Sequence, residues 1–403
     1  MKKIILSLLF IVGFTSVYAQ KANVSKAKNK ALMETPDFAG ARELIKPALA
    51  DETTKNLPNT WYIAGLIGYK ENENIDKGAL MGTTPDPDKK GQVVLESYKY
   101  LVIADSLDQK PDAKGRVKPK HRRDIKKMVK EYYTYNLINY GAHLFDKRDY
   151  AGAYNAFNVF LAIPDLPLSE GEIEKDSTYN MIMYYAAVSA ANAENHSEAI
   201  RLYTKLKDKN YETLTVYQLL CEEYQKQNDT VNYVKVLEEG IERFPTESWF
   251  LQNMINVYIY SGQTKKALEY LNTAINRDPT LAQYHFVGGG LHESLGNLEA
   301  AEAAFLKTIE IDPSIAGAHD ALGRLHYNKA IAILDAIYNV RDNKTIRAEE
   351  AKALEEFKLA LPFYQKASEL EPDQMSYKVM LRTLYYRLKM DKEYEEINKE
   401  INE

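Results

Sequence analysis

"SWFLQNMINVYIYSGQTKKALEYLNTAINRDPT" (residues 248–280) and "AQYHFVGGGLHESLGNLEAAEAAFLKTIEIDPS" (residues 282–314) are the two stretches that decide the fold. They share one pattern of small and large apolar residues when the first is shifted by about 34 residues, a step typical of helical repeats. The positions that coincide are Ala267 with Ala301, Leu271 with Phe305, Ala274 with Thr308, and Pro279 with Pro313. A regular step of this length indicates a chain built from stacked repeats.

Each repeat has room for two helices. Apolar residues recur every three or four positions in both halves, glycine or Asn/Asp separates the halves, and proline usually ends the second. The turn residues include Asp229, Gly262, and Gly296 with Asn297. The same step predicts further units that begin near residues 134, 180, 214, 248, 282, 316 and 375.

The unit near residue 316 is interrupted. Its second-helix residues Ala360, Tyr364, Ala367 and Pro372 come about 25 residues later than the repeat step predicts. The inserted sequence is itself helix-forming, with a turn at "RDNKT". Lengthening both helices by about twelve residues would make a helical finger that extends roughly 18 Å beyond its neighbours. We expect four apolar residues to join its two arms: Ile331, Ile333, Leu334 and Ile337. The finger either docks a partner or braces the array, and the sequence does not choose between these roles.

The register resembles that of the tetratricopeptide repeat (TPR), whose pattern is W-x2-L-G-x2-Y…A-x3-F-x2-A-x4-P over about 34 residues. The resemblance implies an all-α, right-handed superhelical solenoid of antiparallel helix pairs. It further implies a concave groove, lined by the first helix of each repeat, that binds peptides or partner proteins without catalysis. Carried onto this sequence, the groove positions are Gln218, Glu222, Lys226, Trp249, Gln252, Asn256, Tyr260, Gln283, Phe286, Gly290, Asp320, Arg324, Tyr327 and Asn328. For each residue the alternative is an ordinary solvated helix face.

The N-terminal region, residues 20–113, is a divergent TPR-like helical region, and the clearer solenoid occupies residues 114–403. "PDFAGARELIKPALA" places Ala41, Ile45 and Ala48 at second-helix spacing, and "WYIAGLIGY" reads as a first helix. The segment "ENENIDKGALMGTTPDPDKKG" (residues 71–91) is rich in turn residues and is predicted to be a loop.

Residues 1–19 have the features of a secretory signal peptide. Lys2 and Lys3 precede a short apolar run, and "VYA" ends at Ala19, where small residues mark a cleavage site. The apolar run is too short for a stable membrane span. We therefore expect an exported, periplasmic protein, associated with the outer membrane through a partner.

The bulk composition is that of a globular protein, with 45% hydrophobic and 27% charged residues. The formal net charge is −5, which gives no overall attraction to nucleic acid. Cys221 is the single cysteine, so the chain forms no intramolecular disulfide and no multi-cysteine metal site.

The segment "YHFVGGGLHESLG" (residues 284–296) resembles a catalytic sequence at first sight. However, Gly296 stands where a zinc protease needs its second histidine, and no G-x-S-x-G nucleophile accompanies the glycines. His285 and His319, like His292 and His326, are one repeat apart, which favours helix packing over a metal site. We assign no catalytic residue, metal ligand or cofactor. Three glycines inside one helix cost roughly 2 to 3 kcal/mol relative to alanine, so we expect local weakness or a bend.

A basic segment, "KGRVKPKHRRDIKKMVK" (residues 114–130), carries nine Lys or Arg and one Asp. We name Lys118, Lys120, Arg122, Arg123, Lys126 and Lys127 as a basic patch that contacts acidic proteins or anionic components of the cell envelope. The alternative is a solvated helix face with Ile125, Met128 and Val129 packed inward.

These features together predict a non-catalytic TPR scaffold or adaptor of the cell envelope. It would bind a partner protein or peptide in its groove, possess no integral membrane span, bind no nucleic acid, and serve the assembly of outer-membrane or secretion machinery. The rival hypothesis is a carbohydrate or cell-wall binder that uses the groove aromatics.

Overall fold

The computed structural model describes residues 20–402, and the expected signal peptide lies outside this range. Within the described residues the chain is an array of paired helices joined by turns, with no β-strand. This confirms the predicted all-α repeat fold. The described chain divides into two compact units, the N-terminal unit up to Thr230 and the C-terminal unit from Val231. The boundary expected near residue 113 lies inside the first unit.

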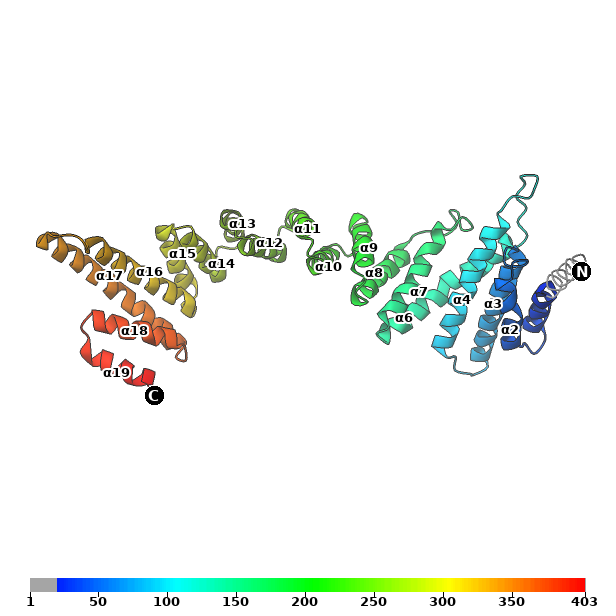
Figure 1. The fold of residues 1–403 in the computed structure, drawn as a ribbon, viewed down its shortest axis with the longest axis horizontal. Helices are drawn as coiled ribbons and strands as arrows, with labels where there is room; N and C mark the ends of the chain where they lie inside the picture. Colours follow the sequence, from blue (N-terminus) through cyan, green and yellow to red (C-terminus); the bar gives the residue numbers. More distant parts are fainter. Residues whose placement is uncertain (1–19, 403) are drawn as a thin grey trace, which may run out of the picture. The chain divides into compact units, whose positions relative to one another are not determined.

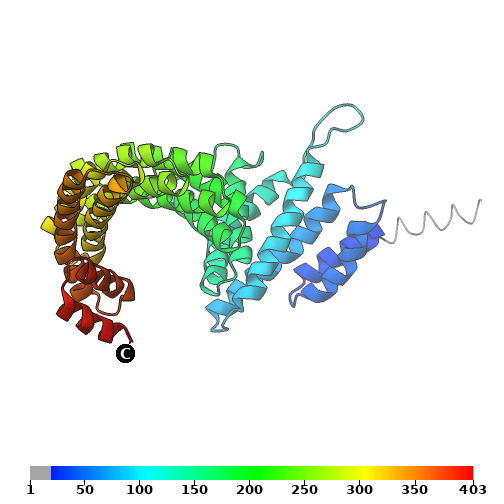
Figure 2. The same ribbon diagram turned by 60° about the vertical axis from the view of Figure 1, so that its left-hand side comes forward.

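The described part of the N-terminal unit starts with a helix over residues 20–32 and contains two long helices, α3 (Pro58–Leu80) and α4 (Pro87–Asp108), that lie side by side (Figure 2). A continuous helical run from Arg122 to Asp146 includes one π-helical turn, η1, in its middle. The elements are α2 (Phe38–Ala50), α3 (Pro58–Leu80), α4 (Pro87–Asp108), α5 (Arg122–Glu131), η1 (Tyr132–Asn136), α6 (Leu137–Asp146), α7 (Tyr150–Ala162), the 3-10 turn η2 (Ile163–Asp165), α8 (Ser177–Asn192), α9 (His196–Asp208) and α10 (Thr213–Lys226).

The C-terminal unit continues the helix pairs (Figure 1). Its helices are α11 (Thr230–Arg243), α12 (Ser248–Tyr260), α13 (Thr264–Arg277), α14 (Ala282–Ser294), α15 (Leu298–Ile311), α16 (Ala316–Ile337), α17 (Asn343–Leu370), α18 (Met375–Arg387) and α19 (Asp391–Asn402). The first helices of the last four repeats start at residues 248, 282, 316 and 375, where the repeat register and its insertion predict them.

The turns follow the local chemistry of the sequence. Gly262 and Gly296 have φ values of 69° and 76°, in the left-handed region that glycine enters without a steric penalty. At helix starts, the side chain of Asp149 accepts the Gly152 N–H of α7, and Asp176 accepts the Tyr179 N–H of α8. Each carboxylate satisfies an N–H group that has no partner within its helix.

A glycine on the first helix faces an aromatic ring of the second helix in three repeats. A Cβ atom on Gly141 would stand 2.3 Å from Phe157, and one on Gly289 would stand 2.4 Å from Phe305. In both pairs the ring occupies position i+16 relative to the glycine. In the third pair, Gly323 with Tyr364, the ring comes later in the chain by the length of the insertion. The buried rings therefore fix the register and confirm the length of the insertion.

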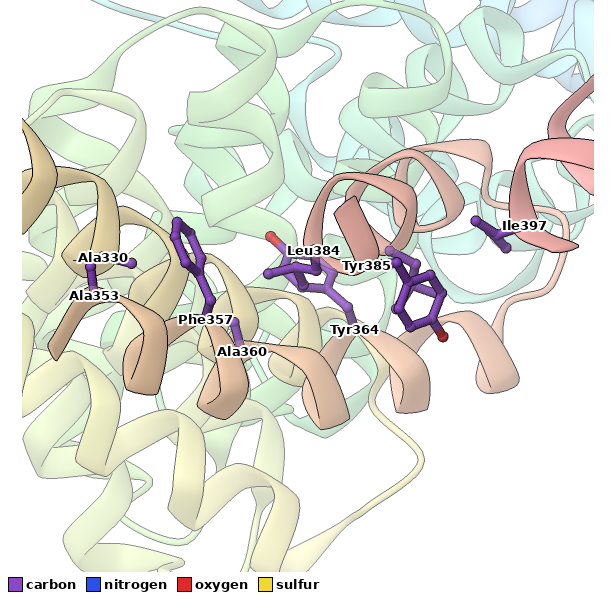
Figure 3. Close-up of a cluster of buried hydrophobic side chains, with 9 residues drawn as sticks. Ala330, Ala353, Phe357, Ala360, Tyr364, Leu384, Tyr385 and Ile397 are labelled. Carbon is purple, nitrogen blue, oxygen red and sulfur yellow. The ribbon is translucent and has the colours of Figure 1, made fainter. Parts of the chain in front are cut away.

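The inserted residues do form a helical finger. α16 has 22 residues and α17 has 28, and the two pack along each other (Figure 1). Ile331, Ile333 and Leu334 pack against the buried cluster at the finger's base, which Phe357, Tyr364 and Leu384 help to form (Figure 3). The Asp342 carboxylate accepts the backbone N–H groups of Lys344 and Thr345 and so starts α17. The predicted apolar contact between the arms is confirmed for these three residues.

The predicted loop over residues 71–91 is wrong. α3 continues to Leu80 and α4 begins at Pro87, so only residues 81–86 connect them. Tertiary contacts hold the polar segment in a helix: Glu71 is buried and pairs with Arg42, and Asn72 accepts a hydrogen bond from Asn136 at 3.0 Å. Local turn composition cannot show such distant partners, so propensity gave the wrong prediction.

Two further expectations concern α14 and membrane spanning. α14 runs from Ala282 to Ser294 without interruption through its three glycines. Across residues 20–402, every helix falls short of the length and apolar character needed to cross a membrane.

Candidate protein-interaction faces

The first helices of the C-terminal repeats contact one another through residues predicted to line the groove. The Gln252 amide on α12 donates a hydrogen bond to the Tyr284 hydroxyl on α14 at 3.1 Å. Arg324 on α16 forms an ion pair with Glu293 on α14. The Phe286 ring lies over Gly317, where a Cβ atom would come within 3.1 Å of it. The outward residues of α12, α14 and α16 therefore form one connected surface, which we call the C-terminal A face.

Amide side chains are the main polar groups of the C-terminal A face. Gln252, Asn256, Gln283 and Asn328 are exposed, and Tyr260 is 88% exposed. Half-buried residues lie between them: Trp249, Phe286, Asp320, Arg324 and Tyr327. Burial raises the pKa of Asp320 above its ordinary value, although the nearby Arg324 acts to lower it.

Gly290 lies on this face with open space around it. A Cβ atom there would meet no neighbouring heavy atom within 4 Å, in contrast to Gly289. Gly288 is buried, and its Cβ would stand 3.4 Å from Leu271. Of the three adjacent glycines, only Gly289 is required by close packing.

Three of the predicted groove residues, Gln218, Glu222 and Lys226, belong to α10 of the N-terminal unit. Gln218 is half-buried and Glu222 is exposed. The Lys226 ammonium pairs with the buried carboxylate of Glu223 at 2.7 Å, and His196 Nδ1 lies 2.7 Å from the other oxygen of Glu223. Lys226 is therefore already bound to an acid of its own helix.

The histidines pack within the repeats, as the sequence favoured. Nε2 of His285 donates to the Pro279 carbonyl and Nε2 of His319 donates to the Pro313 carbonyl, each at 2.9 Å. One contact is thus repeated in two successive units, joining the first helix to the preceding turn. Among residues 20–402, no group of three or more His, Cys, Asp or Glu residues is arranged to hold a metal ion.

His326 joins α16 to α17 at the base of the finger. Its ring stacks on Phe363 with the planes 3° apart, and its Nδ1 lies 2.8 Å from Glu356. Lys329 pairs with the other oxygen of Glu356 at 2.5 Å. Burial on its own would raise the pKa of Glu356, but the hydrogen bonds from Lys329 and His326 outweigh it and leave the pKa below its ordinary value.

The basic patch is partly neutralised within the fold. Arg122 pairs with Asp105 and donates to the Pro167 carbonyl, and Lys126 pairs with Glu172 at 2.5 Å. Lys127 lies 4.0 Å from Glu131. The remaining predicted side chains, Lys118, Lys120 and Arg123, are exposed. Ile125, Met128 and Val129 are buried, as the alternative interpretation of this segment expected.

A second face, which our prediction from the sequence missed, lies on the N-terminal unit between α6 and α8. Among the residues that the groove positions select in the units near 134 and 180 are Ile138, Ala142, Phe145 and Asp146 on α6, and Met181 on α8. These five residues line one hollow of about 410 Å³. The signal was present in the sequence, because the same register had only to be carried two repeats further.

We call the hollow of about 410 Å³ the α6–α8 groove; its lining is largely apolar, and Phe157 of α7 forms its floor. Ile138 also lines an adjoining hollow of about 350 Å³ over Phe160. That smaller hollow is lined mostly by polar and charged side chains, among them Lys130, Glu172, Glu174 and Asp176. Met181 and Tyr185 on the α8 wall are 39% and 40% exposed, which is unusual for neighbouring large side chains with apolar surface.

Ring contacts fix the shape of both hollows. In the larger hollow Phe145 and Tyr185, on opposite walls, meet edge to face with centroids 5.7 Å apart. In the smaller hollow the Tyr133 ring stacks on Phe160 at 4.2 Å. Gly141 lets Phe157 approach the α6 backbone, since a Cβ atom there would collide with the ring. The shape is therefore set by residues that are already packed in the absence of a partner.

The fold and the two faces are those of a helical-repeat protein whose first helices present side chains to a partner. A comparison with known protein families identifies the repeat. Residues 256–281 and 282–315 match the tetratricopeptide repeat. The resemblance predicted from the sequence is therefore confirmed for these two segments. TPR scaffolds are typically non-catalytic and mediate protein–protein interaction.

Individual relatives are more distant. Over 103 residues the chain is 29% identical to human N-alpha-acetyltransferase 16, NatA auxiliary subunit, a match that covers 25% of this chain and only 12% of that protein. A TPR repeats protein from Bacteroides fragilis matches 62% of this chain and 96% of its own, at 20% identity and a TM-score of 0.30. The C-terminal part of a TPR repeat-containing protein from Cytophaga hutchinsonii matches 66% and 93%, at 17% identity and a TM-score of 0.44.

Proposed function

We propose that this protein is an exported, non-catalytic scaffold of the cell envelope that binds a segment of a partner protein on its C-terminal A face. The observation that carries the proposal is the row of exposed amides, Gln252, Asn256, Gln283 and Asn328, beside the exposed ring of Tyr260. The matched repeats at residues 256–315 contribute part of this face.

The chemistry of the face suits an extended polypeptide. A primary amide offers both donors and an acceptor, so it can pair with the N–H and C=O groups of a peptide backbone. A tyrosine adds rigid contact area at low entropic cost. Arg324 and Glu293 already neutralise each other, which limits the contribution of net charge to binding.

The location in the envelope rests on residues 1–19, whose basic start, apolar run and small residues before Gln20 are typical of a secretory signal. An exported scaffold of this kind suits the assembly or maintenance of outer-membrane or secretion machinery, and its partner would hold it at the membrane. Detection of the mature N-terminus at Gln20 in a periplasmic fraction supports export, whereas an intact N-terminus in the cytoplasm contradicts it.

Binding can be tested by crosslinking capture from native envelopes. Asn256→Ala, Tyr260→Ala and Gln283→Ala change exposed residues, so the fold should persist while recovery of the partner falls. Asn272→Ala on α13 is the matched control, because Asn272 is an exposed amide on a second helix. Undiminished capture by all three variants would refute the A face as the binding site. Retention on protein-free cell-wall polymers, lost in Tyr260→Ala, would favour the carbohydrate hypothesis.

A further inference from the structure

We infer that the α6–α8 groove of the N-terminal unit is a separate docking site, and that its occupant is an amphipathic helix with a basic residue at one end. This goes beyond the proposed function, since it concerns another face, in another unit, with another kind of ligand. Three properties of the groove support it: the largely apolar lining, the small number of hydrogen-bonding side chains, and the charge of Asp146.

The lining of the larger hollow is apolar except for the Asp146 carboxylate and the Tyr185 hydroxyl. Ile138, Ala142 and Phe145 form one wall, Met181 and Tyr185 the other, and Phe157 the floor. Two of these residues, Met181 and Tyr185, keep more than a third of their surface exposed. Burying such a surface against apolar side chains of a partner removes it from water and favours the complex.

The groove offers a peptide backbone almost nothing to bond. Away from the helix ends, the backbone groups of α6 and α8 are paired within their own helices, so neither wall provides a strand edge. The larger hollow has only two polar side chains among its lining residues, Asp146 and Tyr185. An extended peptide buried here would leave N–H and C=O groups without hydrogen-bond partners, which weakens its binding. A helix pairs its own backbone and needs only side-chain contacts, so the groove selects a helix.

The carboxylate of Asp146 determines which charge the occupant should carry. This exposed carboxylate is the last residue of α6, where the helix carries partial negative charge. Among residues 20–402 it has no ion-pair partner within 4.0 Å, and Lys147 beside it is bound to Asp88 at 2.7 Å. A lysine or arginine of the partner, placed here, would meet both Asp146 and the carbonyl end of α6. The opposite charge would be repelled by both.

The length of the groove sets the length of the occupant. The groove extends along α6 from Ile138 to Asp146. At about 1.5 Å per residue this distance is about 12 Å, so a helix of about eight to ten residues would span it. Its apolar residues should recur at i, i+3 or i+4, and i+7 to face the groove.

The test uses the full chain and a synthetic amphipathic peptide of about 14 residues, with leucines at helical spacing and lysines at both ends. Binding is measured by fluorescence anisotropy of the labelled peptide. Met181→Glu and Tyr185→Ala should each weaken binding about tenfold or more, because the first places a charge in the apolar wall and the second removes contact area. Asp146→Lys should weaken it several-fold, most strongly at low salt.

The matched control is Met81→Glu, since Met81 is an exposed methionine of the same unit, outside the groove. Circular dichroism should show that every variant keeps its helical signal. Asn256→Ala, on the C-terminal A face, should leave peptide binding unchanged, so failure at one face is distinguishable from failure at the other.

Three results would overturn the inference. The first is no binding of the helical peptide. The second is equal binding of a peptide with a central proline, which cannot form the helix and would indicate an extended ligand. The third is equal or tighter binding of a peptide with glutamate in place of lysine.

Discussion

The α6–α8 groove and the C-terminal A face occupy the same positions of the same repeat, and they present different chemistry. On α6 and α8 those positions hold Ile138, Phe145 and Met181, whereas on α12 and α14 they hold Gln252, Asn256 and Gln283. The scaffold beneath is equivalent, since Gly141 with Phe157 and Gly289 with Phe305 pack alike. One backbone design therefore supports an apolar hollow in one unit and a row of amides in the other, and the ligand class follows from the side chains.

The largest expected effect on stability comes from a substitution at Phe157, on the floor of the groove. Phe157 is 2% exposed, so Phe157→Ala should lower the free energy of unfolding of the N-terminal unit by about 3–5 kcal/mol. The chain has one tryptophan in each unit, Trp61 and Trp249, so urea denaturation can be followed separately in Trp249→Phe and Trp61→Phe backgrounds. We expect the Trp61 transition to shift to lower urea while the Trp249 transition stays in place. An equal shift of both would mean that the units unfold together.

The adjacent glycines of α14 provide a second, smaller contrast. Gly289→Ala should destabilise the C-terminal unit by about 1–3 kcal/mol, because the new methyl group collides with Phe305. Gly290→Ala should instead stabilise it by up to about 1 kcal/mol, since it adds helix propensity in open space.

The same pair of variants reports on partner binding. If the partner backbone approaches α14 closely, Gly290→Ala weakens its binding although the unit is more stable. If binding is unchanged, the glycine at residue 290 serves no recognition role. Thermal unfolding, followed by Trp249 fluorescence, measures the stability of both variants.

A third prediction concerns the polar contacts between first helices. Gln252→Ala removes the hydrogen bond to the Tyr284 hydroxyl and should cost about 0.5–1.5 kcal/mol. Asn256→Ala, one turn further on α12, should stay within about 0.5 kcal/mol of the unchanged protein, as expected of an exposed residue. If both variants prove neutral, the contact between Gln252 and Tyr284 contributes nothing to the alignment of α12 and α14.

The smallest expected effect is a pH dependence at the base of the finger. The pKa of Glu356 is lower in the folded protein than its ordinary value of 4.5, so the folded state binds fewer protons there. Its contribution to stability is present above about pH 4.5 and is lost as the pH falls through the folded pKa. Glu356→Gln should therefore reduce stability at pH 7 and flatten its decline below pH 4.5. Urea midpoints at pH 7 and pH 4 measure this, and parallel declines in both proteins would contradict it.

Much of the fold was predictable because each local signal agreed with the repeat. The regular repeat step placed the helix starts near residues 248, 282 and 316, and the late set at Ala360 and Tyr364 placed the finger. The end of α3 was not predictable. By composition Glu71 and Asn72 resemble loop residues. In the structure they are bound by Arg42 and Asn136, which are far away in the chain.

For the candidate sites, the sequence predicted which residues lie on each face but not which of them are paired. Register alone identified the amides of the C-terminal A face, and the same register would have found Ile138 and Met181 on the other face. It could not show that Arg324 is paired with Glu293, that Lys226 is paired with Glu223, or that Arg122 and Lys126 are neutralised within the fold. Ion pairs of this kind join different helices or depend on rotamers, and neither is encoded in spacing.

The sequence by itself determined the helical class, the repeat length, the insertion and the direction in which each side chain points from its helix. These depend on local periodicity, because a helix of about 3.6 residues per turn places residues three or four positions apart on the same side. Only the tertiary structure decided that Phe157 and Phe160 form the floors of two adjoining hollows. It also decided that Asp146 has no ion-pair partner among the described residues. Such features depend on the distance between helices that are far apart in sequence, and that distance is fixed by packing.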